Sequence, residues 1–71
     1  MNYQKINKAR ARRLFNEGIT IYLNTNKARM TWAIPICRTI ERTFDVLVNE
    51  FSYYNCNSDL GRRVQYFILA D

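Results

Sequence analysis

The chain has 71 residues, of which 48% are hydrophobic and 24% are charged, with eleven lysines and arginines, six acids and no histidine. A chain of this length makes one domain, and folding buries only about 60% of the surface that the unfolded chain exposes. Without histidine it lacks the usual general acid–base and the commonest nitrogen ligand for zinc, so we expect no enzyme, no cofactor and no metal site.

Positive charge is concentrated in the first part of the sequence. Residues 1–30 hold seven of the eleven bases and one acid, whereas residues 31–71 hold four arginines and five acids. A local excess of bases is typical of a surface that binds nucleic acid, a membrane or an acidic protein. It also fits a solvated helix that only aids solubility.

Cys37 and Cys56 are the only cysteines. No apolar run follows Met1, so we expect no secretory signal, a cytoplasmic protein, and two buried free thiols rather than a disulfide. The unbroken apolar stretches are far shorter than the roughly 20 residues that a membrane-spanning helix needs.

The first predicted element is a helix over residues 2–17. At about 100° per residue, its apolar side chains gather on one side, and Lys5, Lys8 and Arg12 stand together on the other. Arg13 flanks this basic stripe. Gly18 follows at the place where a left-handed helix end needs glycine.

Two strands are predicted next. Residues 19–24 alternate between apolar and polar or aromatic side chains, as in a half-buried strand, and residues 24–29 form a polar loop. The second strand covers about residues 31–40, with Trp32 as a core anchor near its start. Pro35 cannot donate a ladder hydrogen bond, so we expect this strand at an edge of the sheet.

A second helix begins after Thr43, which is a suitable N-cap, and Asp45 lies in its first turn, where the helix dipole favours negative charge. The side chains with the spacing of a core-facing side are Phe44, Leu47, Val48, Phe51 and Tyr54.

The last segment fits two elements. Residues 64–68 alternate as in a strand, but residues 58–68 also fit a helix capped by Ser58. Gly61 and the many β-branched and aromatic residues favour the strand. The predicted fold is therefore a single α+β domain over residues 1–71 in the order α-β-β-α-β, with two helices packed on one face of a three-stranded antiparallel sheet.

Two surfaces are candidates for binding. The first combines the cations of the N-terminal helix and the following loop with one strand tyrosine, and it comprises Lys5, Lys8, Arg12, Arg13, Arg29 and Tyr22. Arginine forks suit phosphate, and each neutralised phosphate would make binding depend on salt. The second is the open face of the sheet, where Tyr22, Arg63, Gln65 and Phe67 would form a stacking platform for single-stranded bases. Burial of that face in a homodimer is the alternative.

Tyr53 falls off the apolar side of the second helix, so we expect it to be exposed. Exposed aromatic residues are typical of protein-binding surfaces. Tyr53, Arg63 and Phe67 are therefore candidate contacts for a protein partner.

Residues 44–57 read Phe-Asp-x-Leu-Val-Asn-Glu-Phe-x-Tyr-Tyr-Asn-Cys-Asn. This pattern resembles small uncharacterised proteins of gut-bacterial phages and mobile genetic elements, and the similarity spans about residues 14–68. The resemblance carries no catalytic motif. It implies a binding protein, a class that includes inhibitors of host defence systems.

The sequence thus predicts a small non-enzymatic protein of a phage or mobile element that binds DNA or RNA through an N-terminal basic helix. The alternative is a protein–protein inhibitor of a bacterial defence system, such as an anti-CRISPR-like protein, whose basic residues fit an acidic protein surface. We expect no membrane partner, because the apolar side of the basic helix is needed for the core.

Overall fold

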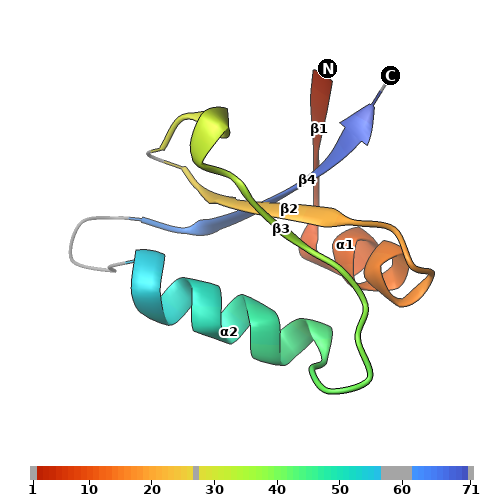
Figure 1. The fold of residues 1–71 in the computed structure, drawn as a ribbon. Coiled ribbons are helices and arrows are strands. Elements are labelled where there is room, and N and C mark those ends of the chain that lie inside the picture. The colour runs from red at the N-terminus through yellow and green to blue at the C-terminus, as the bar shows by residue number, and fades with distance from the viewer. Residues whose placement is uncertain (1, 27, 57–61, 71) are drawn as a thin grey trace.

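Two helices lie on one side of a four-stranded antiparallel sheet (Figure 1). The computed structural model describes residues 2–26, 28–56 and 62–70. Its elements in chain order are β1 (Asn2–Ile6), α1 (Lys8–Asn16), β2 (Ile21–Thr25), the 3-10 turn η1 (Met30–Trp32), β3 (Ile34–Ile36), α2 (Phe44–Asn55) and β4 (Val64–Ala70). The strand order is β1-β4-β2-β3. The predicted α+β class is confirmed, but the sheet has four strands rather than three.

The additional strand is β1, and the prediction of one helix over residues 2–17 is wrong there. Residues 2–6 pair with β4, from Asn2 opposite Ala70 to Ile6 opposite Tyr66. Asn7 then caps α1, because its Oδ1 accepts a hydrogen bond from the Arg10 amide at 2.8 Å. Pairing with a distant strand outweighs a local helical spacing, since propensity is a weak determinant beside tertiary structure. The element order is therefore β-α-β-β-α-β.

The second predicted strand is much shorter than residues 31–40. Its first part forms η1, and β3 pairs with β2 only from Ile21 opposite Ile36 to Leu23 opposite Ile34. β3 is an edge strand, as Pro35 predicted. Trp32 lies in η1 and is 73% exposed, so its assignment as a core anchor is wrong.

The second helix and the last strand agree with the sequence. α2 begins after Thr43, whose Oγ1 accepts a hydrogen bond from the Val46 amide at 3.3 Å. β4 pairs with both β1 and β2, so the strand alternative for the last segment is confirmed. One expectation is wrong: Tyr54 is 79% exposed and does not face the core.

The core lies between the helices and one face of the sheet. It is built from Ile6, Ala11, Phe15, Ile21, Leu23, Phe44, Val48, Phe51 and Tyr66. The Phe15 and Phe44 rings meet edge to face at 5.5 Å, which joins α1 to α2. Burying each large apolar side chain contributes about 1.5–3 kcal/mol. This packing holds both helices on one side and leaves the other side of the sheet uncovered by either helix (Figure 1).

Candidate nucleic-acid interface

The sheet face turned away from the helices carries a row of aromatic and long side chains. Because side chains alternate along a strand, the neighbours of the core residues Ile6, Leu23 and Tyr66 point to this side. The register places Phe67 between Lys5 of β1 and Tyr22 of β2. We call this side the open face, and its residues are Tyr3, Lys5, Tyr22, Arg63, Gln65, Phe67 and Leu69. The sequence predicted Tyr22, Gln65 and Phe67 together here, and β1 adds Tyr3 and Lys5.

The aromatic rings of the open face form a connected group. Tyr3 and Tyr22 meet edge to face, with ring centroids 5.2 Å apart. Phe67 is only 9% exposed although it stands outside the core cluster, whereas Tyr3 and Leu69 are 39% and 42% exposed. Phe67 therefore forms the floor of the group, and the two tyrosines present ring surface to a partner.

The open face carries positive charge, and none of the acids in the described part of the chain lies on it. The four strands contain one charged residue, Lys5, and Arg63 directly precedes β4. The Arg63 backbone is held to Asn26: its amide donates to Asn26 Oδ1 at 2.8 Å, and its carbonyl accepts from the Asn26 amide at 3.1 Å. Among the described residues, neither Lys5 nor Arg63 has an ion-pair partner. Both cations are therefore available to an anion.

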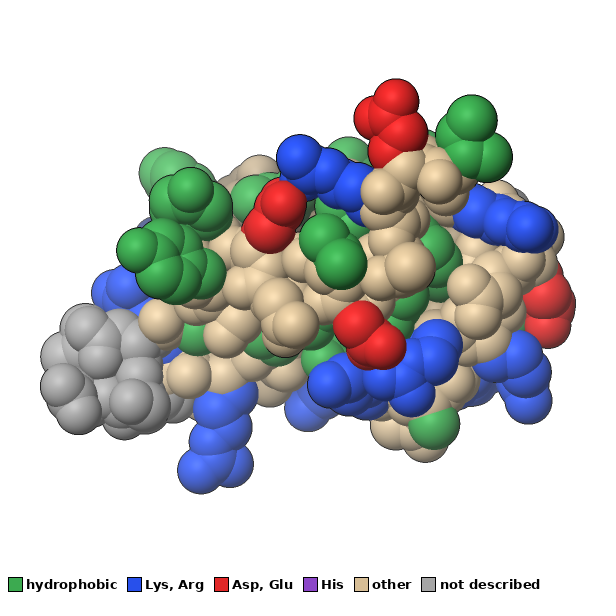
Figure 2. Space-filling view, turned by 90° about the horizontal axis from the view of Figure 1, so that it is seen from below, with side chains coloured by type: hydrophobic (Ala, Val, Ile, Leu, Met, Phe, Trp, Pro, Cys, Tyr) green, Lys and Arg blue, Asp and Glu red, His purple; other side chains and the backbone are tan. Residues whose placement is uncertain are grey.

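Acidic side chains lie instead with the helices. The four acids in the described part of the chain are Glu17, Glu41, Asp45 and Glu50, at the end of α1, in the loop before α2 and within α2. Figure 2 shows this side, where acidic and basic side chains are interspersed. These four acids would therefore repel a polyanion on the helical side rather than on the open face.

The predicted basic stripe on an N-terminal helix does not exist as such. Lys5 is on a strand, and Lys8 is the first residue of α1. The Arg12 guanidinium lies 2.7 Å from the Asp45 carboxylate and 5.6 Å from the centre of the Phe44 ring. Arg13 lies 3.9 Å from Glu17. These two arginines are therefore engaged within the protein.

Arg29 belongs to the loop after β2, and its side chain is exposed. Its carbonyl accepts a hydrogen bond from Asn24 Nδ2 at 2.9 Å, which fastens the loop to the sheet. The sequence counted Asn24 both as the end of a strand and as the start of the loop; it belongs to β2 and is 2% exposed.

Tyr53 is on α2 and 81% exposed, as expected, and its ring meets that of Tyr54 edge to face at 5.0 Å. The structure does not bring it together with Arg63 and Phe67. Those two belong to the open face, on the opposite side of the sheet from α2. The three predicted protein contacts therefore do not form one surface.

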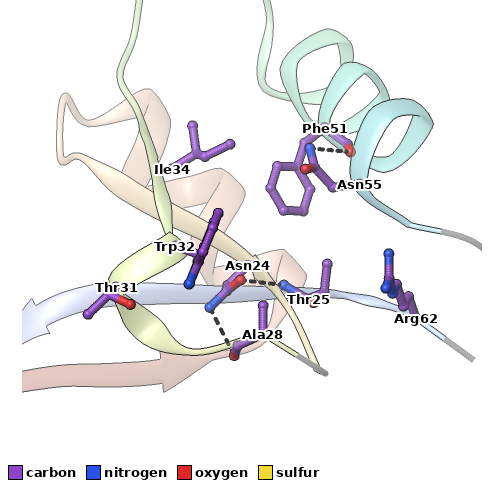
Figure 3. Close-up of a pocket in the computed structure, with 9 residues that line it drawn as sticks. All are labelled: Asn24, Thr25, Ala28, Thr31, Trp32, Ile34, Phe51, Asn55 and Arg62. Atoms are coloured by element: carbon purple, nitrogen blue, oxygen red, sulfur yellow. Dashed lines mark hydrogen bonds between the residues drawn. The ribbon is translucent and has the colours of Figure 1, made fainter.

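Sequence reasoning missed a pocket of about 600 Å³ at the end of the sheet. It is lined by Asn24, Thr25, Ala28, Thr31, Trp32, Ile34, Phe51, Asn55 and Arg62 (Figure 3). These residues come from β2, the loop around η1, β3, α2 and the segment before β4, so no local pattern could reveal the pocket. The one available signal was the pair Thr31-Trp32 next to a basic loop.

The two cysteines differ in their surroundings. Cys37 and Cys56 are both free, but Cys37 is exposed, so the expectation that both are buried is wrong. Burial raises the pKa of the Cys56 thiol, against the lowering effects of a Ser52 hydrogen bond and the Arg62 charge. A thiol with a raised pKa is a poor nucleophile at neutral pH.

Within residues 2–26, 28–56 and 62–70, no group of three or more cysteine or acidic side chains could hold a metal ion. No helix in these ranges is long and apolar enough to cross a membrane. Comparison of the chain with protein-family models, curated proteins and solved structures gave no match.

Proposed function

We propose that the protein binds single-stranded nucleic acid through the open face of its sheet, not through the N-terminal helix. The observation that supports this is the row Lys5, Phe67 and Tyr22 across three strands, flanked by Tyr3 and Arg63, on a face with no acid among the described residues. Unstacked bases stack on aromatic rings, and nearby cations contact the phosphates.

The geometry favours single strands over duplexes. The aromatic rings lie close to the surface of the sheet, and the largely buried Phe67 ring lies beneath the two tyrosines. A sheet surface of this kind receives bases that have left a stack, whereas a duplex keeps its bases paired inside. Stacking contributes about 1–3 kcal/mol per base and tolerates any sequence. We therefore expect weak sequence preference and strong salt dependence.

Fluorescence polarisation with a labelled single-stranded oligonucleotide tests the proposal. Tyr22→Ala should weaken binding about 5- to 150-fold, which corresponds to one lost stacking contact. Tyr53→Ala, on α2, is the matched aromatic control and should bind as the wild type does. Equal losses in both variants would contradict the proposal, provided that circular dichroism shows both to be folded.

The charge contribution is tested in the same assay over a salt series. Lys5→Gln with Arg63→Gln should lower the salt slope by roughly 1.4, since each single-strand phosphate contact contributes about 0.7. Lys8→Gln with Arg13→Gln removes equal charge from α1 and should leave the slope unchanged. If only the α1 variant lowered the salt slope, the result would favour binding through the N-terminal helix over binding through the open face.

The competing homodimer interpretation uses the same face. Light scattering of the free protein at high concentration should give the mass of a monomer. A dimer that Tyr22→Ala dissociates would show that this face pairs with a second copy.

A second candidate function is protein binding, as for an inhibitor of a host defence system. A groove of about 340 Å³ runs between β3 and α2, and its lining includes Ile34, Leu47 and Tyr54. Beside it stand the exposed rings of Tyr53 and Tyr54, and exposed tyrosines are common anchors in protein interfaces. A protein captured from nuclease-treated bacterial lysate by the wild type but not by Tyr54→Ala would favour this function.

A further inference from the structure

The pocket at the end of the sheet is lined by the kinds of side chain that bind nucleotides. Figure 3 shows Trp32 on one side and Arg62 on the other, with Phe51 and Asn55 of α2 along a third wall. From these walls we infer that the pocket is a subsite for one nucleobase and its phosphate. The inference rests on the proposed function, because it places one unit of the bound strand beside the open face.

Trp32 is suited to stack on a base. Its side chain is 73% exposed, which is unusual because tryptophan is highly buried on average. The backbone beneath it is nevertheless fixed: the Trp32 amide donates to the Arg29 carbonyl at 3.0 Å, and the Ala33 amide donates to the Met30 carbonyl at 3.0 Å. Asn24 fastens the same loop to β2. The indole is thus presented by an ordered turn rather than by a loose loop.

The polar groups of the pocket match a base with a phosphate. Asn55 Nδ2 donates to the Phe51 carbonyl at 3.1 Å, which leaves Asn55 Oδ1 as an acceptor without a partner among the described residues. The Arg62 guanidinium has no ion pair within the described part of the chain. An arginine fork binds phosphate oxygens in bidentate geometry. None of the described lining residues is acidic, and the pocket volume is within the range of small-molecule sites.

The pocket and the open face can hold one continuous strand. Arg62 lines the pocket, and Arg63, the next residue, leads into β4 with Gln65 and Phe67 on the open face. Consecutive arginines can therefore contact neighbouring phosphates while the bases lie on different surfaces. A strand that crosses the open face would place one base against Trp32.

Trp32 is the only tryptophan, so its fluorescence reports the pocket directly. Thymidine monophosphate and an oligothymidylate are titrated into the wild type and Arg62→Gln, with Arg10→Gln as the charge-matched control on α1. Stacking should quench Trp32 with both probes. Arg62→Gln should weaken binding of the mononucleotide about tenfold or more, the loss expected for a charge-assisted hydrogen bond, and Arg10→Gln should not.

The outcomes separate the subsite from the proposed function. Absence of quenching by both probes overturns the subsite, even if polarisation shows that the oligonucleotide binds the open face. Equal affinity of Arg62→Gln and Arg10→Gln for the mononucleotide also overturns it. A third outcome is that Arg62→Gln abolishes the quenching while Tyr22→Ala leaves the affinity for the oligonucleotide unchanged. This result would support the subsite in the pocket and contradict binding at the open face.

Discussion

Asn24 provides the most stringent test of how the loop after β2 is held. Its Nδ2 donates to the Arg29 carbonyl at 2.9 Å and lies 3.4 Å from the Ala28 carbonyl, and its Oδ1 accepts from the Thr25 amide at 2.8 Å. The residue is 2% exposed. Asn24→Asp keeps the size and the acceptor but removes the donor, and it turns a carboxylate oxygen toward carbonyl oxygens.

The expected cost follows from these contacts. The lost hydrogen bond contributes about 1 kcal/mol, and the unsatisfied buried group costs about 1–3 kcal/mol more. We therefore expect Asn24→Asp to lower the free energy of unfolding by about 2–4 kcal/mol near neutral pH. Burial beside carbonyl oxygens raises the pKa of the introduced carboxyl group, so the cost should shrink as the pH falls from neutral and be largely gone near pH 4.

Urea unfolding followed by circular dichroism measures this change, and hydrogen exchange of residues 28–32 shows whether the loop is released. Asn7→Asp is the matched control, because Asn7 caps α1 through its Oδ1 and aspartate caps equally well. The reasoning is refuted if the two variants differ by less than about 0.5 kcal/mol.

Three further predictions concern stability, each measured by urea unfolding. Gly18 has a φ of +92° and nothing near its position for an added Cβ, so Gly18→Ala should cost about 1–2 kcal/mol from backbone strain alone; unchanged stability would contradict this. The exposed Asp45–Arg12 pair should contribute less than about 1 kcal/mol, so a larger loss in Asp45→Asn would be unexpected. Burial raises the pKa of the Tyr66 phenol above its ordinary value of 10.0, so the fold favours the neutral form. Stability should therefore fall as the pH rises beyond about 10, and Tyr66→Phe should reduce that fall; equal declines would contradict it.

Local sequence signals were sufficient to predict those helices and strands whose ends and buried faces are determined by nearby residues. Thr43 and the apolar spacing after it predicted α2, and Pro35 predicted an edge strand. Gly18 adopts the left-handed conformation expected at the end of α1. Each of these depends on a cap, a ring constraint or a backbone angle that a single residue determines.

β1 could not be recognised in this way. Its residues pair only with β4, 60 to 68 positions away, and their spacing also fits a helix. The Asn7 cap was the missed signal, since asparagine is a preferred N-cap. Once α1 begins after Asn7, Lys5 moves from the helix to the sheet, and the predicted basic stripe divides between two surfaces.

The candidate site was predicted in part for the same reason. Alternation placed Tyr22 and Phe67 on one face, because strand periodicity is local. The ion pair of Arg12 with Asp45 joins two helices, and the pocket around Trp32 joins five segments. Such contacts depend on the packing of distant elements, which no spacing in the sequence reveals.

The central claim is that the open face binds single-stranded nucleic acid, and NMR titration with an oligothymidylate tests it most directly. We predict the largest amide shifts in β1, β4 and β2, at Tyr3, Lys5, Tyr22 and Phe67, with smaller shifts at the pocket residues Phe51 and Asn55 of α2 and little change along α1. Shifts confined to α1 and α2, or no shifts at all, would contradict it.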